Sequence, residues 1–194
     1  MKVESLSYPN VYSIKVDVVG KNKSKYSQLN NSARKRFNDE DRTSEPKIYL
    51  LTGRNIDATI LYVGQTVQPI QDRMYQGISS QDYKWAKKST SYDLLVWNLC
   101  GLVESESNYD LDSIEAELAF LVRVIQNEWP TYQNSINFRW RLTSNLGNDA
   151  RKVAEMMLIQ FYDYLIKKLV DKGSSTAAIK AEKANLKNIF KIVN

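Results

Sequence analysis

The sequence predicts an α+β fold in which a few short strands are followed by long helices. Two short apolar runs at 47–52 and 59–64 are joined by the turn-rich loop GRNID, which is typical of a pair of strands. A third run of strand length, SYDLLVWNLC, follows at 91–100. Two long segments after residue 112 instead place apolar residues at helical spacing. The predicted order of the central elements is therefore β-β-α-β-α, with extra helices appended.

The chain before these strands divides into a strand and a connection. Residues 11–19, VYSIKVDVV, alternate apolar and polar side chains and predict a strand. Residues 20–46 are rich in Lys, Asn, Ser and Asp, so we expect a long exposed connection there, with a short helix at NNSARKRF.

Two helices are predicted in the middle of the chain. Pro69 suits a first helical turn, which favours a helix over 68–76. Asp112 or Ser113 can cap the stronger helix SIEAELAFLVRVIQNEW, which we expect to end at Pro130. One face of this second helix is apolar and should pack on the core.

The C-terminal segment predicts two more helices. Residues 149–172 are amphipathic and are stopped by Gly173. A last helix covers 175–192, and one of its faces carries a row of lysines at steps of three and four: Lys180, Lys183, Lys187 and Lys191.

Length and composition favour one compact domain. The chain has 194 residues, of which 43% are hydrophobic, enough for one sizeable core. We divide it into an N-terminal strand and basic arm (1–46), a core (47–140) and a C-terminal helical extension (141–194). No apolar run approaches the roughly 20 residues of a membrane span, and the start lacks the apolar region of a secretory signal. We therefore expect a cytoplasmic protein without a membrane partner.

The chain contains no histidine and one cysteine. This composition excludes Ser-His-Asp and Cys-His nucleophile systems and every histidine-ligated metal centre. Any catalysis must use Tyr, Lys, Arg, Asp, Glu or Ser. Any metal must be a hard cation held by oxygen atoms.

Charge is distributed unevenly along a chain whose net charge is +5. Residues 21–47 carry eight Lys or Arg against four acids, and residues 151–194 carry nine against four. Residues 48–150 carry eight against twelve. Basic flanks around an acidic middle fit a polyanion that is held at its edges and acted on at the centre. An ordinary solvated surface would give the same pattern.

Two tyrosines lie in the first two strands of the predicted core. If the turn between the strands centres near Asn55–Ile56, Tyr49 lies opposite Tyr62 and both phenols project from one face. Tyrosines paired in this way are often simple packing. Arg73, on the following short helix, can present a planar fork to a phosphate or can pair with Asp72.

The segments KIYLLTG, ILYVGQT and DR, taken in this order, resemble the GIY-YIG nuclease superfamily. Lys47, Ile48 and Tyr49 stand in place of the first triplet, and 62–64 (YVG) in place of the second. The later segments YDLLVWNL, EAELAFLV and PTYQN match the third strand, the glutamate-bearing helix and the asparagine element of that family. The resemblance covers about residues 47–137.

The resemblance implies a small three-stranded antiparallel sheet flanked by helices, with an added N-terminal strand or arm and C-terminal helices. It also implies hydrolysis of DNA phosphodiester bonds with one divalent cation, Mg²⁺ or Mn²⁺. The implied catalytic residues are Tyr49, Tyr62, Arg73, Glu117 and Asn134, with Glu117 as the metal ligand.

Two of these assignments have rivals. Glu117 is chosen because Phe120 and Leu121 stand at the family's apolar pair, but Glu115 is the alternative ligand. Asn137 is the alternative to Asn134. A neighbouring cation or metal favours phenolate formation, so we expect Tyr49 to activate water and Tyr62 to position it.

The sequence departs from the family pattern at two points. The first glycine is replaced by Lys47. Some members carry a histidine shortly after the arginine, where this chain has Gly77 beside Tyr75. If that histidine helps to activate the nucleophile, another group must replace it, and the candidates are Lys84, Lys87 and Lys88.

The expected partner is double-stranded DNA, and a restriction-type enzyme that cuts both strands is often a homodimer. Basic residues outside the tyrosine segment are candidates for phosphate contacts: Arg34, Lys35, Arg36, Lys84, Lys87, Lys88, Lys180 and Lys187. Two alternatives come from other classes of protein. One is a catalytically inactive nucleic-acid-binding module on the same scaffold, and the other is a general α+β interaction protein whose tyrosines belong to the core.

Overall fold

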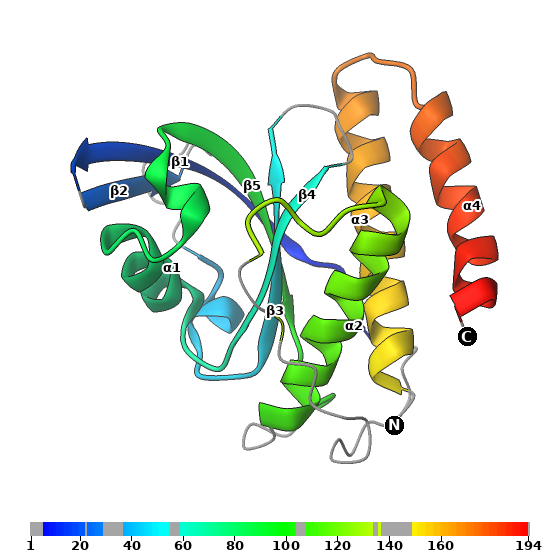
Figure 1. Cartoon of the computed structure of the whole chain (residues 1–194), viewed down its shortest axis with the longest axis horizontal. Coiled ribbons are helices and arrows are strands. Elements are labelled where there is room, and N and C mark those ends of the chain that lie inside the picture. The colour runs from blue at the N-terminus through cyan, green and yellow to red at the C-terminus, as the bar shows by residue number, and fades with distance from the viewer. Residues whose placement is uncertain are drawn as a thin grey trace.

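The centre of the molecule is an antiparallel sheet with helices on both faces (Figure 1). The computed structural model describes residues 6–21, 23–28, 37–54, 59–103, 108–133, 136 and 149–193. Within these residues the sheet has five strands in the order β2-β1-β5-β3-β4. The strands are β1 (Asn10–Gly20), β2 (Lys23–Gln28), β3 (Lys47–Gly53), β4 (Ile60–Thr66) and β5 (Thr90–Asn98).

The predicted α+β class is confirmed, whereas the expectation of a three-stranded sheet is wrong. β4, β3 and β5 are the three expected strands, and β1 widens the sheet by pairing with β5. β2 then pairs with β1, inside the segment where an exposed connection was expected. Its sequence KSKYSQ gives little strand signal, because an edge strand buries few side chains and tolerates polar ones.

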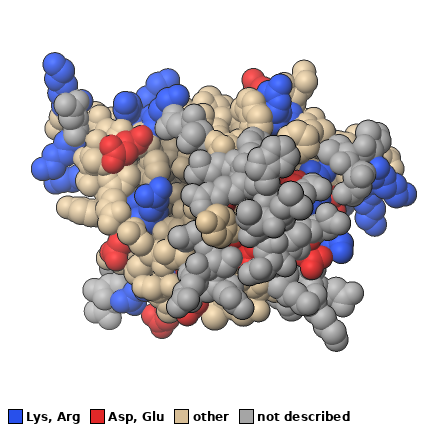
Figure 2. Space-filling view, turned by 60° about the horizontal axis from the view of Figure 1, so that its bottom comes forward, with Lys and Arg blue, Asp and Glu red and all other residues tan. Residues whose placement is uncertain are grey.

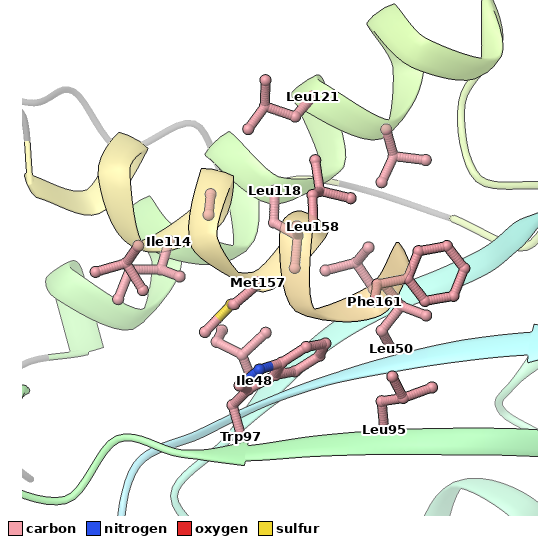
Figure 3. Close-up of a cluster of buried hydrophobic side chains, with 14 of the residues drawn as sticks. Ile48, Leu50, Leu95, Trp97, Ile114, Leu118, Leu121, Met157, Leu158 and Phe161 are labelled. Atoms are coloured by element: carbon pink, nitrogen blue, oxygen red, sulfur yellow. The ribbon is translucent and has the colours of Figure 1, made fainter. Parts of the chain in front are cut away.

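One face of the sheet is covered by α2 (Asn108–Gln126) and α3 (Asp149–Asp171). Figure 3 shows how the sheet's Ile48, Leu50, Leu95 and Trp97 lie toward apolar side chains of these two helices. The helix α4 (Ala177–Val193) packs against α3, so α3 separates it from the sheet. Burial of this apolar surface is the main stabilising term for the arrangement.

The helix α2 begins at Asn108, so the expectation that Asp112 or Ser113 caps it is wrong. Leu111 is fully buried one turn before Ile114, which extends the apolar face toward the N-terminus. The C-terminal stop of α3 is confirmed, because Gly173 follows the helix with a φ of +66°, a conformation that favours glycine.

The other face of the sheet is covered by α1 (Ile70–Ser79) and the short 3-10 helix η3 (Lys84–Lys87). Ile70, Met74 and Ile78 recur at four-residue steps along α1 and are fully buried. They pack with Tyr49 and Leu51, which alternate along β3 with the residues of the first core. Tyr49 and Leu50 therefore belong to opposite faces of the sheet.

A buried carboxylate connects α3 to the sheet. Asp93 of β5 accepts hydrogen bonds from Ser13 Oγ at 2.7 Å, from Tyr164 Oη at 2.6 Å and from Lys168 Nζ at 2.6 Å. Burial alone would raise the pKa of Asp93, but these donors hold it below its ordinary value. The carboxylate is therefore charged and fully partnered.

None of the described helices combines the length and the apolar content needed to cross a membrane. The predicted helix at NNSARKRF falls largely on residues 31–36, outside the described residues. The division at residues 46 and 140 stays a prediction. In the described parts, β1 of the N-terminal segment (1–46) pairs with β5 of the core segment (47–140). α3 of the C-terminal segment (141–194) packs on α2 of the core segment.

Asp93→Asn should lower the free energy of unfolding by about 3 kcal/mol or more, because Lys168 is only 14% exposed and would lose its counter-charge. Since the folded pKa of Asp93 is lowered, its stabilisation is present above the unfolded pKa of about 3.9 and is lost as pH falls through the folded value. Asp39→Asn, at a carboxylate that is 99% exposed, is the matched control and should cost less than about 0.5 kcal/mol. Urea unfolding with equal midpoints for the two variants would contradict the anchoring role.

Candidate active site

The register of β3 and β4 places the two tyrosines on one face but not opposite each other. Tyr49 pairs with Gly64, and Leu51 pairs with Tyr62. The expectation that Tyr49 lies opposite Tyr62 is therefore wrong by two residues, with an irregularity in the pairing after Leu51. A shift of two keeps both phenols on the same face, and their ring centroids are 6.0 Å apart.

Gly64 provides the space in which the Tyr49 ring lies. A Cβ atom at position 64 would be 2.5 Å from both Cζ and the hydroxyl oxygen of Tyr49. No side chain at this position fits without displacing the ring. Tyr49 is consequently pressed against the backbone of β4 and is fully buried.

A third tyrosine, Tyr83, completes the cluster from the segment between α1 and η3. Its hydroxyl lies 3.0 Å from the Tyr49 hydroxyl, and its ring centroid is 5.6 Å from that of Tyr62. A Cβ atom at Gly77 would be 1.9 Å from the Tyr83 ring. Tyr83 thus occupies the space beside the position where some GIY-YIG members carry a histidine.

Sequence reasoning did not single out Tyr83. The signal that marks its place is Gly77 itself, because a glycine inside a helix costs about 1 kcal/mol relative to alanine and often marks a close approach. The lysines expected to replace the histidine, Lys84, Lys87 and Lys88, are exposed. A phenol rather than an amine therefore lies at this point of the cluster.

Arg73 projects from α1 toward the tyrosines. Its guanidinium carbon lies 5.5 Å from the centroid of the Tyr83 ring, within cation–π range. Burial alone would lower the pKa of Arg73, but Tyr49 and Tyr83 raise it above its ordinary value, so the guanidinium is charged. Its Nε atom is buried and has no hydrogen-bond partner. An oxygen-rich anion is the kind of ligand that would satisfy such a donor.

The structure brings Glu115 to the cluster and turns Glu117 away from it. Burial and, to a smaller extent, the charge of Asp112 raise the pKa of Glu115 to about 7, although the charge of Arg73 opposes the shift. The charge of Glu115 also raises the pKa of Tyr62 and of Tyr83, so Glu115 lies within electrostatic range of both phenols. The side chain of Glu115 is partly buried.

Glu117 lies about 200° further round α2 than Glu115, because each helical residue turns the chain by about 100°. Its Oε2 atom is 3.2 Å from Nη1 of Arg151 on α3. Arg151 also contacts Glu155 at 3.0 Å. Glu117 therefore belongs to the contact between α2 and α3, and metal binding by either Glu117 or its rival Glu115 stays a prediction.

The cluster lies at an outer edge of the sheet, where β4 contacts α2. α1 covers the other face and contacts β2, and its Arg73 reaches the Tyr83 ring. Nε2 of Gln65 in β4 donates to Oδ1 of Asp112 in α2 at 3.0 Å, which links the strand to the acidic helix. Side chains from both layers can therefore meet around this edge.

The other predicted site residues are distributed as follows. Asn134 and the arm residues Arg34, Lys35 and Arg36 lie outside the described residues. Lys180 and Lys187 are exposed on α4, which packs on the side of α3 away from the sheet. Their neighbour Lys183 forms an ion pair with Asp163. Figure 2 shows Lys and Arg at separated places on the face it presents.

The expectation of a hard divalent cation stays a prediction, for which Glu115 is the candidate ligand in the cluster. Within the described ranges, no group of three or more acidic or cysteine side chains could hold a metal ion. One carboxylate is nevertheless enough for Mg²⁺, which keeps several of its waters. Burial and the charge of Asp112 both disfavour the ionised form of Glu115 and raise its pKa. A bound cation would stabilise the ionised carboxylate and so oppose both effects.

The phenols are neutral at pH 7. Burial raises the pKa of Tyr49 and Tyr62 well above the usual value near 10, and the charge of Arg73 only partly offsets this. Burial also raises the pKa of Tyr83 to about 12. The expectation that a neighbouring cation favours the phenolate is therefore not met by Arg73. The tyrosines are equipped to donate and orient hydrogen bonds rather than to act as bases.

Comparison with protein-family models, curated proteins and solved structures gives no match for this chain. A function for the chain must therefore be argued from the tyrosine cluster itself, which comprises Tyr49, Tyr62, Arg73, Tyr83 and Glu115.

Gly77→Ala should displace the Tyr83 ring and break its hydrogen bond to Tyr49. Overpacking costs about 1–3 kcal/mol and outweighs the gain of about 1 kcal/mol in helix propensity, so the free energy of unfolding should fall. Gly20→Ala is the matched control, because its Cβ would make only an ordinary contact at 3.9 Å. Urea unfolding in which both variants match the wild type would show that Tyr83 is not held in this way.

The stability of the protein should respond to the charge of Glu115. Because the folded pKa is raised to about 7, this group stabilises the fold below its unfolded pKa of about 4.3 and the contribution is lost as pH rises toward 7. Glu115→Gln should flatten that dependence. At pH 8, Mg²⁺ at about 100 times its Kd should add about 2.7 kcal/mol to the wild type and none to the variant. Equal melting-temperature shifts in both proteins would place any bound Mg²⁺ elsewhere.

Proposed function

We propose that this protein is a metal-dependent DNA endonuclease of the GIY-YIG kind that hydrolyses phosphodiester bonds. The observation that carries the proposal is the convergence of three phenols, a charged guanidinium and a carboxylate at the β4 edge. These groups come from β3, β4, α1, α2 and the segment before η3. The roles they can play are those that phosphodiester hydrolysis requires.

Arg73 binds and stabilises the phosphate. Phosphodiester hydrolysis builds up charge on the phosphoryl oxygens, and a fixed guanidinium offsets that charge. The buried Nε without a partner leaves a donor for such an oxygen. The cation–π contact with the Tyr83 ring restrains the guanidinium before substrate arrives, which reduces the side-chain entropy lost on binding.

The tyrosines hold the nucleophilic water. Neutral phenols at this place orient a water molecule by hydrogen bonding. Tyr62 is partly exposed, whereas Tyr49 is buried, so Tyr62 is the one that can reach the water. The contact between Tyr49 and Tyr83 fixes the hydroxyl directions. Tyr49 thus acts through Tyr83 and Arg73 as a positioning residue.

Glu115 holds the cation, with Mg²⁺ or Mn²⁺ as the ions suited to a single carboxylate. A divalent cation at such a site supplies Lewis-acid polarisation of the phosphate and stabilises the departing oxygen. Glu115 must be ionised for this role, so its raised pKa predicts weaker metal binding below pH 7.

The proposed substrate is double-stranded DNA, and the proposed role is of the restriction type. A homodimer would supply a second site for the other strand. The alternative is an inactive nucleic-acid-binding module. It is favoured by one observation, that Tyr49 is fully buried and its hydroxyl is already paired with Tyr83.

Glu115→Gln should reduce Mg²⁺-dependent cleavage of supercoiled plasmid by at least about 100-fold, because the transition state loses several kcal/mol of stabilisation. DNA binding in EDTA should be retained. Glu117→Gln is the matched control on the same helix. It should cleave at nearly the wild-type rate but unfold at a lower urea concentration, since Arg151 loses one of its partners.

Two results would overturn the assignment. If Glu115→Gln cleaves as fast as the wild type, the carboxylate is not part of the machinery. If folded Glu117→Gln is inactive, the metal ligand is Glu117. Wild-type protein that binds DNA but does not cleave genomic DNA with Mg²⁺ or Mn²⁺ would favour the module.

A further inference from the structure

An open groove of about 540 Å³ lies beside the tyrosine cluster, at the loop end of the β3–β4 pair. Its basic lining residues are Arg54, just after β3, and Lys88, just before β5. The other polar lining residues carry hydroxyl groups: Ser89, Thr90, Ser91, Tyr92, whose hydroxyl donates to the Trp85 carbonyl, and Tyr132. None of the described lining residues is acidic. The groove is therefore a positively charged surface rich in hydrogen-bonding groups.

The two cations of the groove are available to a ligand. The Arg54 side chain is 49% exposed, and its Nε lies 3.9 Å from Asp93. That carboxylate already accepts three shorter hydrogen bonds, so it orients Arg54 without occupying the whole guanidinium. Lys88 is exposed. Ser89 Oγ accepts a hydrogen bond from the Val18 amide, which leaves its own proton to donate outward.

The groove is joined to the tyrosine cluster by continuous aromatic contacts. Tyr83 stacks on Trp85 with centroids 5.0 Å apart, and Trp85 meets Tyr92 of the groove edge-on at 5.5 Å. The Tyr132 amide donates to the Leu61 carbonyl at 2.8 Å, next to Tyr62 in β4. These buried contacts place the groove and the tyrosines in one cluster on the same face of the sheet.

We propose that this groove binds the sugar–phosphate backbone of the DNA on one side of the bond that is cleaved. This inference rests on the proposed function and names the path of its substrate. Arg54 and Lys88 contact successive phosphates, and the hydroxyls of Ser89 and Thr90 donate to phosphate oxygens. An open groove with cations from two separate segments suits a chain of phosphates better than one enclosed small anion.

The test is the salt dependence of DNA binding in EDTA, where no cleavage takes place. The probe is a fluorescein-labelled duplex of about 20 base pairs, and anisotropy gives Kd from about 50 to 200 mM NaCl. Arg54→Ala/Lys88→Ala should bind at least about tenfold more weakly at low salt. Its slope of log K against log salt should fall by about 1.8 relative to the wild type, since each lost phosphate contact contributes about 0.9.

Lys152→Ala/Lys167→Ala is the charge-matched control, because both lysines are exposed on α3, which covers the other face of the sheet. It should keep the wild-type slope. Arg54→Lys/Lys88→Arg keeps both charges and should also keep the slope, which separates lost charge from a folding defect. Equal slopes for the two double-alanine variants, or a wild type that does not bind the duplex, would overturn the proposal that this groove binds DNA. A wild type that binds DNA through the groove but never cleaves it would instead overturn only the proposed nuclease activity.

Discussion

The contact between the hydroxyls of Tyr49 and Tyr83, 3.0 Å apart, is the constraint on which the rest of the candidate site depends. It exists because Gly64 and Gly77 leave room for the two rings against the backbone of β4 and α1. The Tyr83 ring then supports Arg73, and Tyr62 packs beside it. Close packing of this kind allows little adjustment, so the directions of the polar groups are set before any ligand binds.

Burial decides the charge state of these groups. The three phenols stay neutral because desolvation outweighs the field of Arg73, whereas the guanidinium stays charged because its pKa begins far above neutrality. Burial and the charge of Asp112 also raise the pKa of Glu115 to about 7. Ionisable groups with strongly shifted pKa values that lie together are typical of functional sites. We therefore propose a catalytic role for this edge and a structural role for the Asp93 network. In that network every charge is matched by a close partner.

The parts of the fold that the sequence predicts are those with a strong periodic signal. The apolar runs of β3, β4 and β5 and the amphipathic pattern of α3 place these elements within a few residues, and the two tyrosines are placed on one face. β2 escapes prediction because an edge strand needs few apolar residues. The start of α2 escapes because Asp112 and Ser113 are of the residue types that cap helices, although here they lie inside one. Glu115 and Glu117 cannot be separated by linear spacing, since the rotation between two residues of a helix decides which one faces β4. Tyr83 reaches the site through a turn whose path no periodicity encodes.

The most direct test of the site as a whole is anomalous diffraction from crystals grown with Mn²⁺. The proposed site predicts one strong anomalous peak about 2 Å from a Glu115 carboxylate oxygen, which is the distance of a coordinated ion. The peak should lie on the side of Glu115 that faces Tyr62 and Arg73. A peak at Glu117, or no peak near Glu115 at pH 8 and millimolar Mn²⁺, would contradict it.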